Sequence, residues 1–314
     1  MTAPAIPNTL IARPHMAREL ANGMRLTDYN GLNHHISPYV EMTAETLSRA
    51  CLVVLCVKGP ATQTAIEQIA LHAPLASPVL SLQNGLAPVR ELSAAMPDRV
   101  IIPGMVSFNV ARRGPTHWHK GSAGQVIAER HWILDLLATP LGTGPAALKL
   151  VDDMAPIQWG KLLLNLNNAI NALSGLTLRA QLGQYAYRRV LAAAIKEALD
   201  LMDYAGIRPA TVGATTPQAM VRMLRLPDIL FRNIALRLQR IDAHARSSMA
   251  DDFAAGKPSE INALNGEIVH LAEAQGRRAP INAALVDLVM NAENGGQRQF
   301  SGPELVAAVK LHSA

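Results

Sequence analysis

One stretch of this 314-residue chain decides its interpretation: Trp159-Gly160-Lys161-Leu162-Leu163-Leu164-Asn165-Leu166-Asn167-Asn168-Ala169-Ile170-Asn171-Ala172-Leu173. It predicts a helix too apolar to lie on a surface, yet it carries one lysine and four asparagines. With about 100° of rotation per residue, Asn165 lies at about 40° and Asn168 at about 340° from Lys161. These three side chains therefore share one stripe of the helix, whereas Asn167 and Asn171 point elsewhere.

The polar stripe on this helix needs an explanation. Asparagine is a mediocre helix former because its side chain competes for backbone hydrogen bonds, so helix propensity does not explain the choice. One interpretation is a solvated face whose lysine extends into water. The other is a buried helix whose polar groups have partners, since unpaired polar groups are costly to bury. Leucine on nearly every other side favours a helix that presents Lys161 and two amides to a cleft.

The composition bounds the class of protein. The chain is 49% hydrophobic and 17% charged, which is typical of a soluble globular protein, and its length suggests two domains. No run approaches the roughly 18 apolar residues that a membrane-spanning helix needs, and the N-terminus does not look like a secretory signal. We therefore expect a cytoplasmic protein. Cys51 and Cys56 share one apolar run, and we expect both to be buried, reduced and unpaired.

Charge and histidine content narrow the partners. The net charge of +5 favours anionic ligands, but the basic residues are dispersed and aromatic residues make up only 4% of the chain. Nucleic-acid binding is disfavoured, and a small phosphorylated or carboxylate ligand fits the charge. The ten histidines form no clear metal site. His117 and His119 could coordinate a metal, but exposure at a strand edge is the favoured interpretation, so we predict no metal.

Strand and helix patterns alternate through the first half of the chain. The run from Cys51 to Val57 is continuously apolar, as a parallel strand buried on both faces requires. Similar runs cover Pro78–Leu82 and Val100–Val106, with helical patterns between them. The alternation predicts a doubly wound, Rossmann-like α/β domain over residues 1–153.

After residue 153 only helical periodicity is found, which predicts an all-helical domain over residues 154–314. With no long linker, we expect the two domains to pack together and leave a cleft. The expected helices cover residues Leu191–Ala205, Pro217–Leu224, Pro227–Met249, Ser259–Ala274 and Asn282–Met290.

Polar residues follow the predicted strands. Ligands of such sheets bind beyond the carboxyl ends of the strands, where Arg13, Lys58 and Asn84 are expected. An arginine after the second strand of a dinucleotide domain can meet the 2′-phosphate of NADP, although it could also be an exposed turn residue. Asn84-Gly85 could be only a tight turn, or it could offer an amide at the sheet edge. The glycine-rich motif that normally holds the dinucleotide after the first strand is not found.

In the helical half, Ser248 and Glu260 are further candidates. A structural explanation exists for both residues. Ser259 could cap a helix that Glu260 begins, where the helix dipole favours an acid, and Ser248 could be a hydroxyl near a helix end.

Together these segments resemble the ketopantoate reductase (2-dehydropantoate 2-reductase) family, whose members have a Rossmann-like domain followed by a helical domain. The resemblance extends from about residue 9 to residue 295 in the family's order. It is carried by Leu10-Ile11-Ala12-Arg13-Pro14, Val57-Lys58, Leu82-Gln83-Asn84-Gly85, Trp159-Gly160-Lys161-Leu162-Leu163-Leu164-Asn165, Ser247-Ser248-Met249 with Asp252, and Glu260-Ile261-Asn262 with Asn265-Gly266.

The resemblance implies a role for each candidate residue. Arg13 would bind the 2′-phosphate of NADPH, Lys58 would lie beside the adenosine, and Asn84 would lie by the nicotinamide ribose and the substrate. Lys161 would donate the proton to the ketone oxygen. The remaining polar residues would surround ketopantoate: Asn165, Asn168, Ser248 and Glu260. Asn168 lies next to Ala169, the position at which the family often has a second asparagine.

The chain departs from the family pattern at its start. Relatives begin with a strand, a glycine-rich turn and a helix before the strand that precedes Arg13, and this first βα unit is missing here. Two alternatives therefore stay open: a catalytically silent relative that retains a ligand-binding cleft, and a related reductase of another small 2-oxo acid. A homodimer is compatible with the sequence but does not follow from it.

Overall fold

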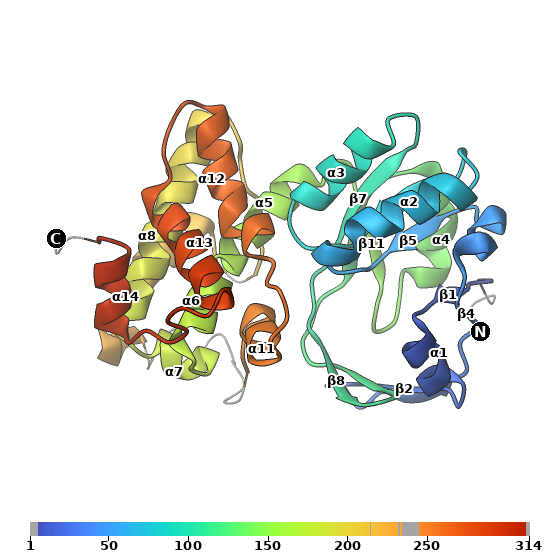
Figure 1. The fold of residues 1–314 in the computed structure, drawn as a ribbon, viewed down its shortest axis with the longest axis horizontal. Helices are drawn as coiled ribbons and strands as arrows, with labels where there is room; N and C mark the ends of the chain where they lie inside the picture. Colours follow the sequence, from blue (N-terminus) through green and yellow to red (C-terminus); the bar gives the residue numbers. More distant parts are fainter. Residues whose placement is uncertain (1–5, 214, 232, 234–244, 312–314) are drawn as a thin grey trace. The chain divides into compact units, whose positions relative to one another are not determined.

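The computed structural model describes residues 6–213, 215–231, 233 and 245–311. The chain packs as two compact units, which Figure 1 shows in blue to green and in green to red. The first unit runs to Asn84 and resumes over Pro88–Met154. The second consists of Gly85–Ala87 and the chain from Ala155 onward.

The first unit contains all of the described strands, in three sheets, with short helices between them. Its elements are β1 (Leu10–Ile11), α1 (Pro14–Leu20), β2 (Met24–Asp28), β3 (Asn33–Ile36), β4 (Val40–Glu41), η1 (Ala44–Arg49), β5 (Val53–Leu55), η2 (Gly59–Ala61), α2 (Thr62–His72), β6 (Val79–Ser81), α3 (Ala87–Ala95), β7 (Ile101–Val106), β8 (Val110–Gly114), β9 (His117–Lys120), β10 (Val126–Glu129), α4 (Trp132–Leu141) and β11 (Leu148–Val151).

The main sheet has five strands in the order β11-β10-β7-β6-β5. All neighbours are parallel except β7 and β10. Strand β6 is buried on both faces: Val79 packs with α2 and α3, and the next residue, Leu80, packs with α4 on the opposite face. Helices thus cover both faces of a mostly parallel sheet, which confirms the Rossmann-like architecture expected from the apolar runs.

The expectation that the run from Cys51 to Val57 is buried on both faces was wrong. Strand β5 is an edge strand of the described sheet, and Val54 on it is 48% exposed while Val53 and Leu55 are buried. The cluster beneath α4 contains no residue of β5, so one face of this strand has no described cover. Cys51 and Cys56, which flank the strand, are free and exposed rather than buried.

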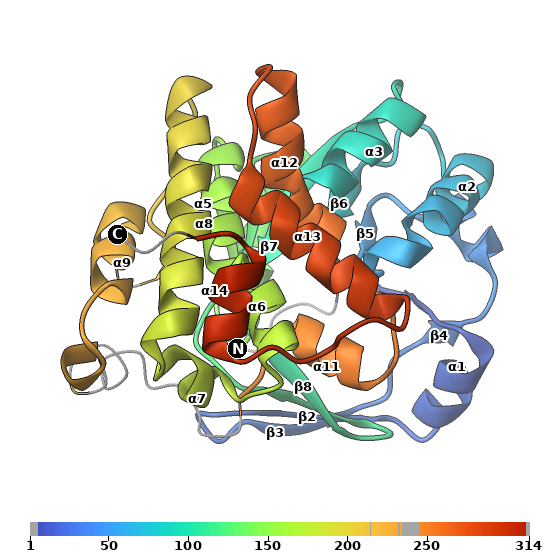
Figure 2. The ribbon, with the colours of Figure 1, turned by 60° about the vertical axis from the view of Figure 1, so that its left-hand side comes forward.

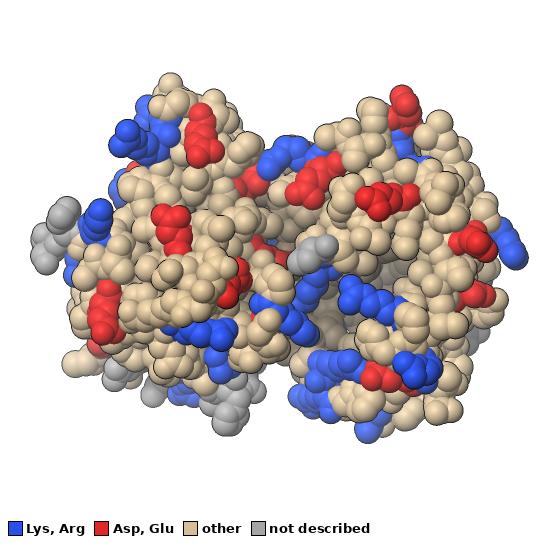
Figure 3. Space-filling model, in the orientation of Figure 1, with Lys and Arg blue, Asp and Glu red and all other residues tan. Residues whose placement is uncertain are grey.

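A second sheet of four strands, β3-β2-β9-β8, was not foreseen as a unit. Strands β2 and β9 pair with each other across about ninety residues: Arg25 lies opposite His117 and Thr27 opposite His119. In Figure 3 several of the Lys and Arg side chains of the visible face lie over this sheet, where Figure 1 places β2 and β8.

The second unit is helical throughout its described part (Figures 1 and 2). Its elements are α5 (Ala155–Asn165), α6 (Asn167–Ser174), α7 (Leu178–Leu182), α8 (Tyr185–Tyr204), α9 (Pro217–Leu224), α11 (Ser248–Ala254), η3 (Ile261–Ala263), α12 (Asn265–Ala274), α13 (Pro280–Glu293) and α14 (Gly302–Ala308). No helix in the described ranges has the length and apolar character to cross a membrane.

The core of this unit forms around α5 and α6, whose leucines, apart from the exposed Leu164, are almost completely buried in one cluster with residues of α8, α12 and α13. Burial of the large side chains of this core supplies the main stabilisation of the unit, since each contributes about 1.5–3 kcal/mol. The most buried large apolar side chains of the two helices and their junction are Leu162, Leu163, Leu166, Ile170 and Leu173.

Two expected helices need correction. The helix expected over Pro227–Met249 lies in large part outside the described residues, but it does not continue to Met249, because residues 245–247 are extended and a new helix begins at Ser248. The helix expected to begin at Glu260 begins at Asn265. A 3₁₀ turn, η3, precedes it, and Ser259 caps that turn by accepting a hydrogen bond from the Ile261 amide.

A buried arginine ties the second unit together. Arg188 on α8 is 0% exposed, and its guanidinium forms an ion pair with Asp228 at 2.9 Å. It also donates to three backbone carbonyls at the ends of α7 and α9, those of Leu182, Leu224 and Leu226. Loss of the guanidinium would remove this donor from all three carbonyl groups, and unpaired buried acceptors are costly.

We predict that Arg188→Met lowers the free energy of unfolding by about 3–5 kcal/mol, because three carbonyl groups lose their donor and each unpaired buried acceptor costs about 1–3 kcal/mol. Urea denaturation followed by circular dichroism would measure this as a lower midpoint at an unchanged slope. Arg222→Met, at an exposed site on α9, is the control and should change stability by less than about 0.5 kcal/mol. Equal midpoints for the two variants would contradict the structural role of Arg188.

Candidate active site

The polar stripe predicted on the apolar helix is present. Lys161, Asn165 and Asn168 are half-buried, whereas Asn167 and Asn171 are buried and bond elsewhere in the helical unit. The helical run changes from α5 to α6 at Leu166, which keeps helical dihedral angles, so the stripe continues across the junction. The two classes of asparagine that the helical spacing separates therefore have different environments.

Gly160 explains how the lysine-bearing helix is held. A Cβ atom at this position would lie 2.2 Å from the carbonyl oxygen of Ala210, so only glycine allows the segment after α8 to approach. That segment is fastened by a hydrogen bond from the Ala210 amide to the Pro156 carbonyl at 2.7 Å. The residue directly before Lys161 thus fixes the backbone from which the amine projects.

Burial and one carboxylate set the electrostatics of Lys161. Burial lowers the pKa of its ammonium below the ordinary value of 10.5, because desolvation disfavours the charged form, and the nearby Glu260 carboxylate opposes this by favouring it. The structure therefore brings Lys161 and Glu260 together, although 99 positions separate them in the sequence. A cation held in a partly desolvated place beside one acid can act as a proton donor.

Glu260 does not begin a helix, so the structural explanation considered for it from sequence is not the one observed. It is the residue before η3, with φ −95° and ψ 27°, and no dipole of a helix that it begins accounts for its charge. Gly85 packs against the same turn. With φ +84°, its Cα lies so close to the Ala263 carbonyl that a Cβ atom would stand 2.6 Å from the oxygen. Sequence analysis interpreted Asn84-Gly85 as a tight turn or as a polar segment at the sheet edge, and it did not predict this contact with Ala263.

Ser248 is the first residue of α11 and is exposed, whereas its neighbour Ser247 is buried. The Ser247 hydroxyl accepts a hydrogen bond from the Ala250 amide and donates to the Asn168 carbonyl at 3.4 Å. The helix that carries Ser248 is thereby fastened beside Asn168. Sequence analysis proposed Ser248 but gave no role to Ser247 or Asn171. The sequence feature that could have pointed to them is their position, because Ser247 adjoins Ser248 and Asn171 lies one helical turn after Asn168.

The three candidates of the first unit lie at strand ends. Arg13 follows β1, is exposed and occupies the position before Pro14 at the start of α1. Lys58 follows β5 and is exposed, and Asn84 follows β6 and is half-buried. No described carboxylate pairs with the Arg13 guanidinium, which leaves it available to an anion. The carboxyl ends of β5 and β6 meet at one edge of the sheet because the two strands are parallel.

The histidine pair of β9 has an internal partner. His117 and His119 each form a hydrogen bond with the Thr27 hydroxyl, at 2.8 Å in both cases. Partial burial, followed by the charges of Arg25 and Arg113, lowers the pKa of His117. Within the described ranges no group of three or more His, Cys, Asp or Glu side chains could hold a metal ion.

The sequence and structure were compared with known proteins. The family model described as ketopantoate reductase PanE/ApbA matches residues 5–131, and its C-terminal counterpart matches residues 153–293. A 2-dehydropantoate 2-reductase of Halobacterium salinarum is 27% identical over 90% of this chain and 89% of its own length. One of Pyrobaculum aerophilum is 30% identical over 68% of each chain.

Solved structures agree in fold. The PanE/ApbA family ketopantoate reductase of Ralstonia eutropha superposes with a TM-score of 0.78 at 25% identity, over 91% of this chain and 90% of that chain. A D-mandelate dehydrogenase solved with NADH and anilino(oxo)acetate has a TM-score of 0.74 at 16% identity, over 91% of both chains. Family models that together cover most of the chain, relatives of up to 30% identity and the fold agree, and the chain belongs to the PanE/ApbA ketopantoate reductase family.

Proposed function

We propose that this protein reduces 2-dehydropantoate (ketopantoate) to pantoate with NADPH, as a step of pantothenate and coenzyme A synthesis. The observation that carries the proposal is the partly desolvated Lys161 ammonium beside Glu260, on a buried helix whose same stripe carries two amides. The names of the curated relatives support the same reaction. The proposal assigns the catalytic roles to Lys161 and Glu260.

Lys161 supplies the proton of the proposed reaction. NADPH, when bound, would supply the hydride that is added to the carbonyl carbon. The carbonyl oxygen gains negative charge as its double bond opens, and the Lys161 ammonium first stabilises this charge and then transfers a proton to give the hydroxyl of pantoate. The neutral amine regains its proton from solvent. The Glu260 carboxylate keeps the amine charged for the next cycle.

The remaining polar residues orient the substrate in this proposal. Asn165 and Asn168 lie on the stripe of Lys161, and each amide can donate to a carboxylate or hydroxyl oxygen. Ser248 presents a hydroxyl from the start of α11, and Asn84 presents an amide from the end of β6. Hydrogen-bond donors and acceptors held at fixed positions can orient a small acid that carries both a carboxylate and a ketone oxygen.

The first unit fits the charged end of NADPH in part. The exposed Arg13 guanidinium has the fork geometry that phosphate binding favours. Lys58 follows β5, in a different sheet from β1, and is proposed to contact the adenosine. The sequence offers no glycine-rich turn after a first strand for the pyrophosphate. Among the described residues, the proposal assigns cofactor contacts to Arg13, Lys58 and Asn84.

A related reductase of another small 2-oxo acid is the second candidate. D-mandelate dehydrogenase, with its bound NADH and oxo acid, shares the fold at 16% identity, so the fold accommodates more than one such substrate. NADPH oxidation by the purified protein with ketopantoate and a panel of 2-oxo acids distinguishes the two candidates. Oxidation with none of them would favour the catalytically silent relative. The homodimer remains a prediction for sedimentation analysis.

We predict that Lys161→Ala lowers kcat about 10²- to 10⁴-fold, the usual contribution of a positioned general acid. Stopped-flow measurement of NADPH oxidation with saturating ketopantoate tests this. Lys196→Ala is the matched control, because Lys196 is an exposed lysine of α8 paired with Asp200, and its kcat should be unchanged. Unchanged turnover in Lys161→Ala would remove this residue from the mechanism.

The shifted pKa of Lys161 predicts the pH dependence of ketone reduction. The reaction needs the ammonium form, so kcat should be constant below the pKa of the folded protein and fall as the pH rises through it. Because burial lowers this pKa, the decline should begin below pH 10.5. Glu260→Gln removes the opposing charge and should move the decline to lower pH. A decline that this variant leaves unmoved would contradict the coupling.

Arg13 should select NADPH over NADH. Loss of a charge-assisted hydrogen bond costs about 1.5–3 kcal/mol, so Arg13→Gln should raise the KM for NADPH about 10- to 100-fold. The KM for NADH should change less than about 3-fold, because NADH lacks the 2′-phosphate. Arg18→Gln, an exposed arginine of α1, is the control. Equal effects on both cofactors would show that Arg13 does not contact the phosphate.

A further inference from the structure

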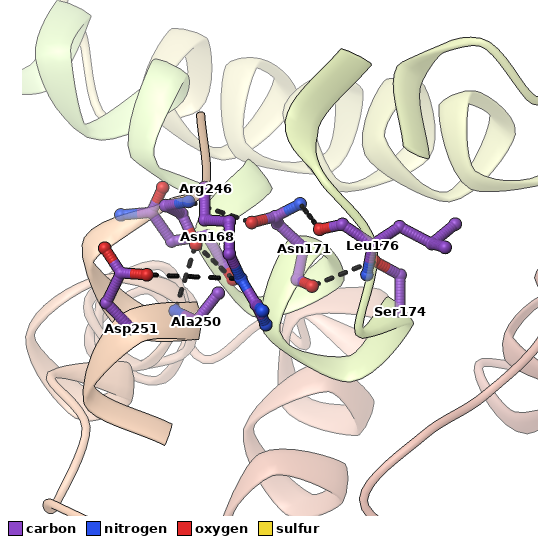
Figure 4. Close-up of polar contacts among 8 residues, drawn as sticks. Asn168, Asn171, Ser174, Leu176, Arg246, Ala250 and Asp251 are labelled. Atoms are coloured by element: carbon purple, nitrogen blue, oxygen red, sulfur yellow. Dashed lines mark hydrogen bonds and ion pairs between the residues drawn. The ribbon is translucent and has the colours of Figure 1, made fainter. Parts of the chain in front are cut away.

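A buried asparagine that does not belong to the polar stripe connects two elements of the proposed substrate site. Asn171 on α6 is 0% exposed. Its side-chain oxygen accepts a hydrogen bond from the Ser247 backbone amide at 2.9 Å, and its side-chain nitrogen donates to the Leu176 carbonyl at 3.1 Å. Figure 4 shows the Asn171 side chain extending toward Leu176. One side chain must therefore donate and accept at once, which an amide does and a carboxylate or hydrocarbon does not.

The bond to Ser247 completes an unusual helix cap. Ser247 is the N-cap residue of α11, and its hydroxyl accepts from the Ala250 amide. In a capping box, a Glu or Gln at the third helical position returns a hydrogen bond to the backbone amide of the N-cap residue. Here that position is Ala250, which has no such group. Asn171 supplies the missing acceptor from a different helix, 76 residues earlier in the chain.

The consequence is a fixed position for the next residue. Ser247 is held by the Asn171 oxygen on one side and by the Asn168 carbonyl on another, so the start of α11 is fastened to α6 at two points one turn apart. The Ser174 hydroxyl donates to the Asn171 carbonyl and accepts from the Leu176 amide, which fixes the end of α6 that carries Asn171. Ser248 follows directly and is exposed. Its hydroxyl is thereby set relative to Asn168 on the polar stripe.

We propose that Asn171 is a positioning residue for the oxo-acid substrate, acting through Ser248 by completing the cap of α11 from the neighbouring helix. The inference rests on the proposed function, since it takes Ser248 as a substrate contact. It does not require Asn171 to touch the substrate. A misplacement of about 1 Å in a binding group can cost up to about 10²-fold in rate, so a lost cap is sufficient to weaken substrate binding.

The test compares Asn171→Ala with a matched control. Asn167→Ala removes another buried asparagine of α6, whose side chain pairs reciprocally with Gln181 and has no bond to α11. We expect Asn171→Ala to raise the KM for ketopantoate about 10-fold while the KM for NADPH stays within about 2-fold, as expected for a group that acts on one ligand. Asn167→Ala should leave both values unchanged. Equal changes in the two variants would overturn the proposal.

A double-mutant cycle shows whether Asn171 acts through Ser248. If it does, Ser248→Ala should raise the KM for ketopantoate in the wild-type background and change it less than about 2-fold in the Asn171→Ala background, because coupled residues are not additive. Fully additive effects would assign Asn171 to general stability only. Asn171→Asp keeps an acceptor for the Ser247 amide. If Asn171→Ala does not fold, this variant replaces it in the test, and a KM for ketopantoate near the wild-type value supports the proposal.

Amide hydrogen exchange tests the positioning without turnover. Peptides covering residues 247–254 should exchange faster in Asn171→Ala than in Asn167→Ala, because the Ser247 amide and the first turn of α11 lose their anchor. Unchanged exchange in this segment would contradict the cap. A wild-type protein that neither binds nor reduces any oxo acid would instead remove the proposed function and the substrate role of Ser248, while the exchange result still decides the positioning role of Asn171.

Discussion

The structure of the helical unit depends on the desolvation of polar groups on α5 and α6. These helices are packed by leucine and isoleucine on most sides, and every lysine or asparagine on them must find a partner or reach a cavity. For Lys161 the compensation is electrostatic, through Glu260. For Asn167 and Asn171 it is hydrogen bonding, to α7 and to the start of α11. The same physical demand thus generates both the proposed reactive group and the contacts that hold its surroundings.

The need for partners also organises elements that are far apart in the chain. Arg188 gathers the ends of α7 and α9 because a buried guanidinium has five donors to satisfy. Asn282 on α13 bonds Asn265 of α12 and the Glu197 carboxylate of α8, which joins three helices around one amide. Such fully buried groups cost free energy when isolated and contribute specificity when paired, because only one arrangement of the helices satisfies them. The leucine core supplies stability, and these polar groups select the packing.

Local pattern predicted much of this fold. The helical spacing separated the stripe of Lys161 from Asn167 and Asn171, and the apolar run before Gln83 predicted a strand buried on both faces. These features depend on neighbours in sequence and on one average environment, which a periodic pattern records. The exposure of Val54 was not predictable in this way, because it depends on which strand lies at the edge of the sheet.

Long-range pairing was the main part that pattern did not reveal. The four-stranded sheet joins residues about ninety positions apart, and its His and Thr side chains carry no periodic signal of their partner. The start of α12 was misplaced because a serine and a glutamate before an apolar run are typical of a helix start, whereas here a 3₁₀ turn intervenes. Asn171 was recognisable only as an asparagine off the stripe. Its partner on α11 lies beyond any local window.

The proposed functional residues share a simple arrangement along the chain. Lys161 follows Gly160, whose missing side chain fixes the helix against Ala210. Ser248 follows Ser247, which caps its helix and is anchored by Asn171. In each pair one residue holds the backbone from which its neighbour presents a polar group. A polar group whose backbone is fixed in this way is confined to few positions, which is what orientation of a ligand requires.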